Sequence, residues 1–246
     1  MYYRKLSLFF LFISVIVLNS SCKKKASLNL STIKIAAIDY YRSGGIAYHY
    51  HITYDTYNNV DSIVSVGGGT DTGSNSFEVF TYTGSSFQIK DQQNYSLLVY
   101  ANTNGMILEI LKTDTILMKY NGSELAELDY KSPSTAYPYY TISATDYQWN
   151  NGDITTFGPS HGVVDSYYYD LRHGGQVGDA MRIDEFINYG RSYTNSSHLP
   201  VQLKYSNGEE NYYYTYDSEG RISTFMKVIT DNNSPKDTTE YIYRYY

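Results

Sequence analysis

The sequence predicts an all-β protein built as an antiparallel meander of short strands. It holds 31 tyrosines against 9 phenylalanines and a single tryptophan. Tyrosine occupies every second position in the stretches 212–216 and 241–245, and a period of two places these side chains on one face of a strand. Clusters of Asn, Asp and Gly interrupt such runs at intervals of roughly ten residues, the spacing of hairpins in an all-β sheet or barrel.

Eleven runs carry the strand pattern most clearly. We expect strands over residues 46–53, 62–66, 77–82, 96–101, 115–120, 139–144, 163–169, 201–205, 211–216, 222–230 and 239–245. One stretch breaks the rhythm, because residues 178–190 (GDAMRIDEFINYG) place Met181, Phe186 and Tyr189 among charged neighbours. This spacing predicts a short helix or a long loop between two strands.

The first 21 residues have the layout of a secretory signal peptide. Arg4 and Lys5 give a positive start, an apolar run covers residues 6–18, and small polar residues follow up to Ser21. The apolar run is shorter than the roughly 20 residues that a membrane-spanning helix needs. We therefore expect residues 1–21 to be cleaved rather than retained.

Cys22 follows directly and is the only cysteine in the chain. Small exported proteins often use cysteines in pairs, so a lone cysteine between a signal peptide and three lysines indicates a lipid attachment site. The alternative is an ordinary signal peptide cleaved nearby, with an incidental cysteine. On the first interpretation, residues 22–31 are the lipidated cysteine and a tether, and residues 32–246 are the β domain.

The charge balance disfavours one class of partner. Without Arg4 and Lys5, the chain keeps 17 basic groups against 25 acidic ones, a formal charge of −8. Proteins that bind nucleic acids present basic surfaces to the phosphates. We therefore expect no nucleic-acid partner.

A weak internal repeat accompanies the strand pattern. The stretches 50–63, 147–157 and 212–225 each combine an aromatic strand, a turn of Asn, Asp or Gly, and an apolar-polar strand that leaves the turn. Repeats of this kind indicate one supersecondary unit used several times. The sequence therefore predicts a meander of similar hairpins.

Several motifs of these hairpins point to a known family. They are Tyr214-Thr215-Tyr216-Asp217 with Gly220-Arg221-Ile222, the alternation Tyr241-x-Tyr243-x-Tyr245, the turn at 149–155, and His198-Leu199-Pro200-Val201. With them the chain resembles a Bacteroidetes lipoprotein family described only as a domain of unknown function with a porin-like fold. YD-repeat proteins share the Tyr-Asp-x-x-Gly-Arg element. The resemblance implies an antiparallel meander curled into an open or partial barrel at the outer membrane, and it brings no catalytic residue.

The candidate binding residues are aromatic. Trp149 and Tyr147 lie beside the turn at 150–153, and such rings offer an apolar face with a polar rim to a sugar or a partner protein. The alternative is that they fill the buried face of the sheet. His49 and His51 share a strand face and are permissible zinc ligands. No second close pair completes a site, so we interpret them as surface histidines and expect no metal or other cofactor.

The leading hypothesis is a non-catalytic binding module of the cell envelope. It would be held at the outer membrane by its lipid and would bind a glycan, a peptide or an envelope protein. No hydrolase or nucleotide-binding motif with its structural context occurs, so we expect no enzyme. A structural or assembly lipoprotein is the first alternative, and a hydrolase is the second. The mean hydropathy of −0.43 and charges within the strands predict a domain that is soluble without detergent, against the rival of a transmembrane barrel.

Overall fold

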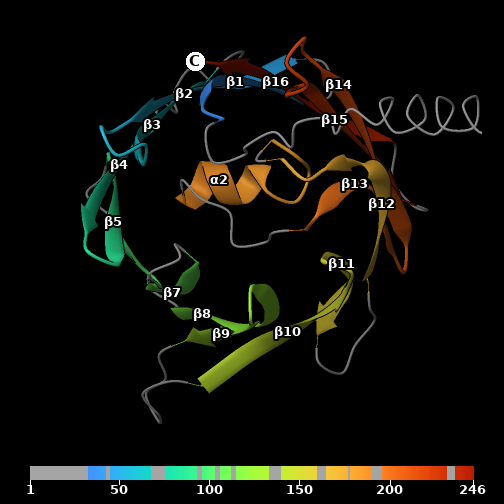
Figure 1. Cartoon of the computed structure of the whole chain (residues 1–246), viewed down its shortest axis with the longest axis horizontal. Coiled ribbons are helices and arrows are strands. Elements are labelled where there is room, and N and C mark those ends of the chain that lie inside the picture. The colour runs from blue at the N-terminus through green and yellow to red at the C-terminus, as the bar shows by residue number, and fades with distance from the viewer. Residues whose placement is uncertain are drawn as a thin grey trace, which may run out of the picture. The chain divides into compact units, whose positions relative to one another are not determined.

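The chain forms a closed barrel of antiparallel strands (Figure 1). The computed structural model describes residues 33–42, 45–67, 76–92, 96–102, 106–111, 115–132, 140–159, 165–176, 178–189, 196–231 and 236–246. Within these ranges, each strand pairs with its neighbours in the sequence, and the last strand pairs with the first. The architecture is therefore an up-and-down barrel of sixteen strands.

The elements follow the chain in simple order. The strands are β1 (Ile35–Arg42), β2 (Gly45–Tyr54), β3 (Val60–Gly67), β4 (Ser76–Thr83), β5 (Ser86–Asp91), β6 (Ser96–Ala101), β7 (Ile107–Leu111), β8 (Thr115–Asn121), β9 (Glu124–Ser132), β10 (Tyr140–Asn150), β11 (Asp153–Pro159), β12 (Asp165–Gly174), β13 (His198–Tyr205), β14 (Gly208–Tyr216), β15 (Ile222–Asp231) and β16 (Asp237–Tyr245). The helix α2 (Ile183–Tyr189) lies between β12 and β13. The all-β class and a short helix within 178–190 are thus confirmed.

The expectation of an open or partial barrel is wrong. β1 pairs with β16 from Ile35 opposite Tyr245 to Arg42 opposite Thr239, and this pairing removes both free edges of the sheet. Alternation shows which face of a strand is buried, but not whether the first and last strands meet. Closure also needs strands that the pattern did not single out, namely β1, β5, β7, β9 and β11.

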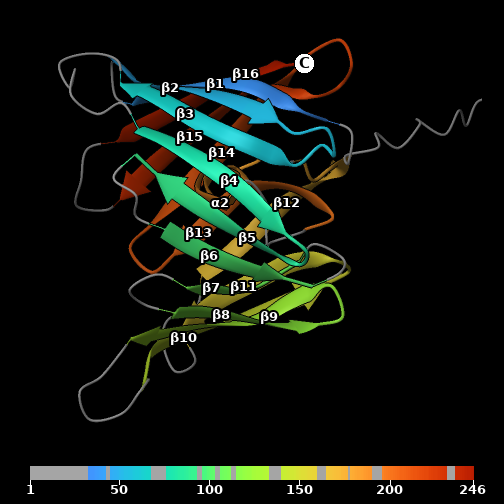
Figure 2. The same cartoon turned by 90° about the vertical axis from the view of Figure 1, so that its left-hand side faces the viewer.

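The inner face of the barrel is apolar and aromatic. Its buried side chains include Ile38, Phe87, Val99 and Phe225, which are at most 2% exposed. Figure 1 looks along the barrel and shows α2 inside the ring, near β13 and β16 and away from β8 to β10. Figure 2, turned by 90°, shows the strands tilted side by side across the wall.

The outer face carries ion pairs. Asp39 on β1 lies 2.6 Å from Nδ1 of His49 and accepts a hydrogen bond of 2.8 Å from Arg244. Half a turn around the barrel, Lys119 on β8 pairs with Glu127 and with Asp129 on β9. Charged side chains in the middle of these strands therefore point outward.

Helices of the described residues are all too short or too polar to cross a bilayer.

Candidate functional site

Part of the barrel lumen is filled by a plug, which we define as the described residues 175–176, 178–189 and 196–197 between β12 and β13. The fully buried Asp179 accepts hydrogen bonds of 3.1 Å from the N–H groups of Met181 and Arg182. Its other oxygen accepts the N–H of Gln176 at 3.0 Å and pairs with the Arg182 guanidinium. Burial raises the pKa of Asp179, and Arg182 opposes that rise. One buried acid–base pair therefore shapes the turn that leads into α2.

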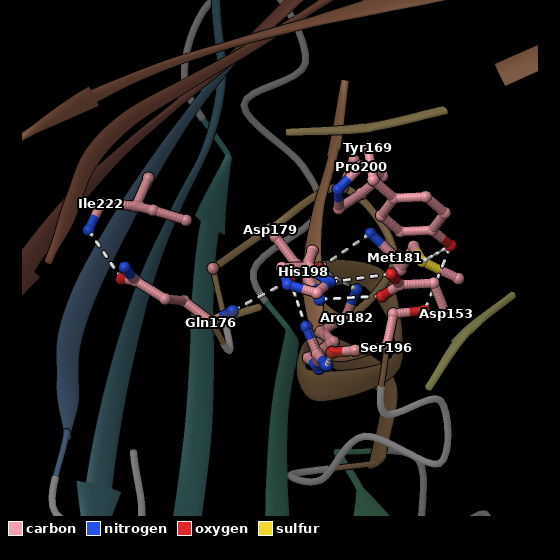
Figure 3. Close-up of polar contacts among 12 residues, drawn as sticks. Asp153, Tyr169, Gln176, Asp179, Met181, Arg182, Ser196, His198, Pro200 and Ile222 are labelled. Carbon is pink, nitrogen blue, oxygen red and sulfur yellow. Dashed lines mark hydrogen bonds and ion pairs between the residues drawn. The ribbon is translucent and has the colours of Figure 1, made fainter. Parts of the chain in front are cut away.

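Two hairpin turns hold the plug (Figure 3). The Gln176 amide donates to the carbonyl of Gly220 at 3.1 Å, and its oxygen accepts the N–H of Ile222 at 3.0 Å. At the other side, the N–H of His198 donates to Asp153 at 2.9 Å, and its Nδ1 lies 2.8 Å from the second oxygen. Because the strands alternate in direction, the β10–β11 and β14–β15 turns lie at the same end of the barrel. The plug enters and leaves the lumen there.

Gly152 in the β10–β11 turn lets the end of the plug, at Ser197, approach the backbone closely. Its φ is 82°, and its carbonyl accepts the N–H of Ser197 at 2.7 Å. A Cβ at this position would lie 2.3 Å from the Ser197 hydroxyl oxygen. Any other residue would therefore strain the backbone and push the plug away.

A hydrogen bond from an aromatic side chain to a backbone carbonyl recurs at this same end of the barrel and joins neighbouring strands. In each case, an aromatic side chain late in an even-numbered strand donates to the carbonyl of a residue early in the preceding strand. The pairs are Tyr54 to Ile35 (3.1 Å), Tyr82 to Val60 (2.9 Å), Tyr120 to Ile107 (2.8 Å), Trp149 to Leu125 (2.7 Å), Tyr169 to Ile154 (2.7 Å), Tyr214 to Pro200 (2.8 Å) and Tyr245 to Ile222 (2.6 Å). We call these bonds the latches. They give the internal sequence repeat a structural meaning, because each repeat supplies one donor and one apolar acceptor residue.

The two aromatic residues expected to bind a ligand occupy different roles. Trp149 is a latch, since its indole N–H is committed to the Leu125 carbonyl and its half-buried ring packs against the core. Tyr147, two residues earlier on the same inward face of β10, is half-buried and makes no latch. The geometry therefore favours Tyr147 over Trp149 as a residue that can meet a ligand.

Two similar aromatic stacks line opposite parts of the inner wall. The first, which we call the covered stack, consists of Tyr214, Phe225 and Tyr241 on β14, β15 and β16, with ring centroids 5.3 Å apart at both steps. Phe225 and Tyr241 are 1% and 5% exposed. The plug meets this stack directly, because the Tyr214 hydroxyl accepts the N–H of Ala180 and the Tyr241 hydroxyl donates to Asp184.

The second, which we call the open stack, consists of Tyr147, Phe157 and Tyr167 on β10, β11 and β12. Their centroids are 5.9 and 5.4 Å apart, with interplanar angles of 14° and 23°. All three rings are only half-buried although they face the lumen. Neither the Tyr147 nor the Tyr167 hydroxyl has a hydrogen-bond partner among the described residues. The open stack therefore borders space that water can reach, and it offers two hydroxyls to a ligand.

Asp184 and Glu185 are consecutive acidic residues in the first turn of α2. Asp184 bonds to Tyr241 of the covered stack. Burial, followed by the Glu185 carboxylate, raises the pKa of Tyr147. For Tyr167, burial is again the largest cause, followed by Tyr169, Glu210, Tyr147 and Glu185.

The remaining predicted residues lie elsewhere. His49 contacts Asp39 on the outer face, and His51 is exposed there. No group of three or more His, Cys, Asp or Glu side chains within the described ranges is placed to hold a metal ion. Cys22 falls outside the described residues, as do the signal peptide and the tether. The lipid attachment therefore stays a prediction.

Comparisons with known proteins identify the fold but no family. No family model matches the chain, and no curated protein matches its sequence. Among solved structures it is similar to a porin-like protein from Bacteroides uniformis, with a TM-score of 0.62 and 10% sequence identity, over 86% of this chain and 96% of that one. The porin-like fold expected from the hairpin motifs is thus confirmed. At this identity the likeness shows the fold alone.

Proposed function

We propose that this chain is a non-catalytic binding protein of the cell envelope, which stands in water on a lipid anchor and takes its ligand in the barrel lumen. The open stack carries this proposal. All three of its residues are half-buried, and the Tyr147 and Tyr167 hydroxyls make no hydrogen bond to the described residues. Ligand sites combine such apolar walls with a few polar groups.

The outer face supports a barrel that stands in water. A barrel in a bilayer presents an apolar band about 25 Å tall to lipid, and a Lys or Arg at its midplane costs about 2–4 kcal/mol. Here Lys119 and Arg244 lie on outward-facing strand positions together with their acidic partners. The buried apolar core instead faces the lumen, the reverse of a water-filled pore.

The anchor is tested separately. We expect Cys22→Ser to abolish incorporation of a labelled fatty acid and to move the protein from the membrane to the soluble fraction, because the variant lacks the thiol that would carry the lipid. Label retained by the variant would refute lipidation at Cys22.

A hydrolytic site is the less favoured reading of the Asp153–His198 pair. Ser196 lies two residues from His198 and is buried. Its hydroxyl is engaged by the N–H of Ile154 at 3.3 Å and by Tyr169 at 3.1 Å. These bonds fasten the plug to β11 and β12, which is a structural task.

An assembly protein is the alternative that a surface feature favours. Val66, Phe77 and Val79 on β3 and β4 point outward and are 39%, 43% and 37% exposed. Neighbouring apolar side chains on an outer wall are typical of contact surfaces. A partner protein would meet this patch rather than the lumen.

Chemical modification distinguishes the lumen binding site from the assembly role. We propose nitrating the full-length chain in mild detergent with and without a pool of envelope glycans, peptides and small metabolites, followed by peptide mass spectrometry. A lumen ligand should protect Tyr147 and Tyr167 but not Tyr168, the outward-facing neighbour of Tyr167, which is 48% exposed. Binding that is lost in Phe77→Ser but kept in Tyr147→Ala would favour the assembly role and refute the lumen site.

A further inference from the structure

We propose that one end of the barrel docks on the lipid headgroup surface of the membrane that holds the anchor, through Tyr57, Leu171 and Tyr246. We call it the plug end, because it carries the β10–β11 and β14–β15 turns that hold the plug. The inference rests on the lipid anchor of the proposed function and adds how the barrel is oriented on that anchor. The outer wall of the barrel stays in water.

The most exposed large apolar and aromatic side chains lie at this end. Among the described residues, Tyr57, Leu171 and Tyr246 are 84%, 72% and 70% exposed, whereas every other side chain of this kind is at most 53% exposed. Tyr57 lies in the turn between β2 and β3, Tyr246 follows the end of β16, and Leu171 lies near the end of β12. Because the strands alternate in direction, these three positions and the start of β1 all lie at the plug end.

The three side chains are spread over half of the rim. In the order of the barrel, three strands separate β12 from β16 and one strand separates β16 from β2, and Figure 1 shows them following one another along the ring. Contacts at separate points of a rim fix the direction of the barrel axis, whereas a single contact would let the barrel fall onto its side. The arrangement therefore suits a flat partner such as a membrane surface.

The turn that carries Tyr57 is held by its own hydrogen bonds. Asp55 accepts the N–H groups of Tyr57 at 2.8 Å and of Asn59 at 2.9 Å, and Asn58 adopts a positive φ of 68°. An ordered turn therefore presents the ring outward. Tyrosine is enriched where the headgroups of a bilayer meet water, because its ring is apolar and its hydroxyl is polar.

A pocket of about 320 Å³ lies beside Tyr246, and Lys34, Thr53 and Tyr54 complete its lining. The Tyr54 and Tyr246 rings meet edge to face, with centroids 5.9 Å apart. The Lys34 ammonium lies 5.1 Å from the Tyr54 ring centroid and forms no ion pair with the described residues. A lysine without an acidic partner, beside two tyrosines, suits the phosphate of a lipid headgroup.

The arginines next to these side chains are already paired with acids. Arg172, which follows Leu171, pairs with Asp170. Arg221, whose guanidinium lies 4.5 Å from the Tyr245 ring centroid, pairs with Asp217. Apolar contact rather than net charge therefore carries the docking, and zwitterionic lipids should support it.

The position of the anchor brings this end to the membrane. Cys22 lies 12 positions before Lys34, and a chain spans at most about 3.6 Å per residue, which limits the distance between them to about 43 Å. A lipid that already holds the chain at the surface makes the contact intramolecular, so a small patch is enough. The opposite end of the barrel then faces away from the membrane.

The test places a second tryptophan at the rim and measures its contact with lipid. Tyr57→Trp and Leu171→Trp replace exposed side chains, and Tyr213→Trp on the outer wall, at a position 53% exposed, is the matched control. Each chain, purified with its lipid, is incorporated into phosphatidylcholine vesicles whose acyl chains are brominated near the headgroup. The emission of the unchanged chain, which comes from Trp149, is subtracted.

Bromine quenches only rings that lie close to it, so the loss of emission reports contact with the bilayer. We expect at least half of the added emission to be lost in Tyr57→Trp and in Leu171→Trp, and less than a tenth in Tyr213→Trp. Adding Lys34→Gln to Tyr57→Trp should reduce the loss, because it removes the ammonium that holds the headgroup phosphate.

The other outcomes refute the docking or a defined part of it. No loss at any position, in chains that float with the vesicles, would show that the barrel stands clear of the membrane. An equal loss in Tyr213→Trp would show that the wall lies on the lipid, which contradicts the end-on contact and a wall in water. A loss in Tyr57→Trp alone would refute the contact through Leu171. An unchanged loss after Lys34→Gln would refute the role of that ammonium.

Failure of the anchor is measured separately. If the chain does not float with the vesicles and Cys22 carries no lipid, the anchor of the proposed function fails. The free Cys22 thiol is then coupled to a maleimide-bearing lipid in the same vesicles, and the same loss of emission decides whether the plug end docks.

Discussion

The covered stack and the open stack are the same Tyr–Phe–Tyr arrangement in two different settings. Both span three neighbouring strands, with centroids 5.3 to 5.9 Å apart. One is closed by the plug and its hydroxyls are engaged by the plug or the wall. The other keeps accessible rings. The difference shows that aromatic stacking belongs to the barrel wall, whereas burial depends on where the plug lies.

A matched pair of substitutions measures this difference directly. Phe225→Ala should lower the free energy of unfolding by about 3–5 kcal/mol, the cost of emptying a fully buried aromatic site. Phe157→Ala, the middle ring of the open stack, should cost clearly less, because solvent already reaches part of it. Urea unfolding followed by circular dichroism compares the two. Equal losses would mean that the open stack is packed as tightly as the covered one.

Loosening the plug should make the two stacks alike. Asp179→Ala leaves the Arg182 guanidinium buried without its carboxylate, and breaking such a pair costs about 3 kcal/mol or more. We expect nitration of Tyr241 to rise toward that of Tyr147 in this variant. Asp170→Ala serves as the control, since that carboxylate pairs with Arg172 on the surface. Unchanged protection of Tyr241 in a destabilised variant would show that the plug does not cover the stack through this pair.

The latches offer a finer comparison on a single strand. Tyr169→Phe removes the hydroxyl that donates to the Ile154 carbonyl at 2.7 Å, and a hydrogen bond of this kind contributes about 1 kcal/mol. Tyr167→Phe, two residues earlier, removes a hydroxyl with no partner among the described residues and should leave stability nearly unchanged. Thermal unfolding of both variants checks the difference. A clear loss in Tyr167→Phe would mean that its hydroxyl is already engaged.

Local patterns were enough to predict the strands that alternate strongly. Each of the eleven expected runs falls on a strand, and residues 96–101 coincide with β6. β1 escaped notice because its sequence IAAIDYYR lacks a regular alternation. Its burial comes from contacts on both faces, with Asp39 covered by His49 and Arg244 on the outside. Closure of the barrel depends on that strand, so the missed element and the wrong expectation of an open barrel have one cause.

The candidate site was predictable only in part. Tyr147 was named from its place beside a turn, but Phe157 and Tyr167 join it through strand register, which the sequence does not state. The latches did leave a signal, since each repeat places an aromatic residue before a turn and an apolar one after it. By that signal, Trp149 is a latch residue, and in the structure its indole N–H donates to the Leu125 carbonyl. Glu185 was missed because no local pattern shows which wall a seven-residue helix faces.

The smallest expected effect separates the two acidic residues of α2. Burial, followed by Glu185, raises the pKa of Tyr120 and Tyr147. Burial, followed by Asp184, raises the pKa of Tyr241. An ordinary phenol ionises near pH 10, so the unfolded chain loses these protons there while the folded barrel keeps them. The stability that goes with the raised pKa values is therefore present below about pH 10 and is lost as the pH rises further.

Removing either charge should move alkaline unfolding to higher pH. Glu185→Gln removes one cause of the raised pKa at Tyr120, Tyr147, Tyr167 and Tyr189, so the folded values fall toward 10 and less stability is lost. We expect its midpoint to rise by a fraction of a pH unit, and Asp184→Asn, which acts chiefly on Tyr241, to raise it less. Glu240→Gln on the outer face of β16 is the control and should leave it unchanged. The midpoints are read from tyrosinate absorbance near 295 nm together with circular dichroism. A larger shift for Asp184→Asn than for Glu185→Gln would show that Asp184 has the stronger influence on the tyrosines of the lumen.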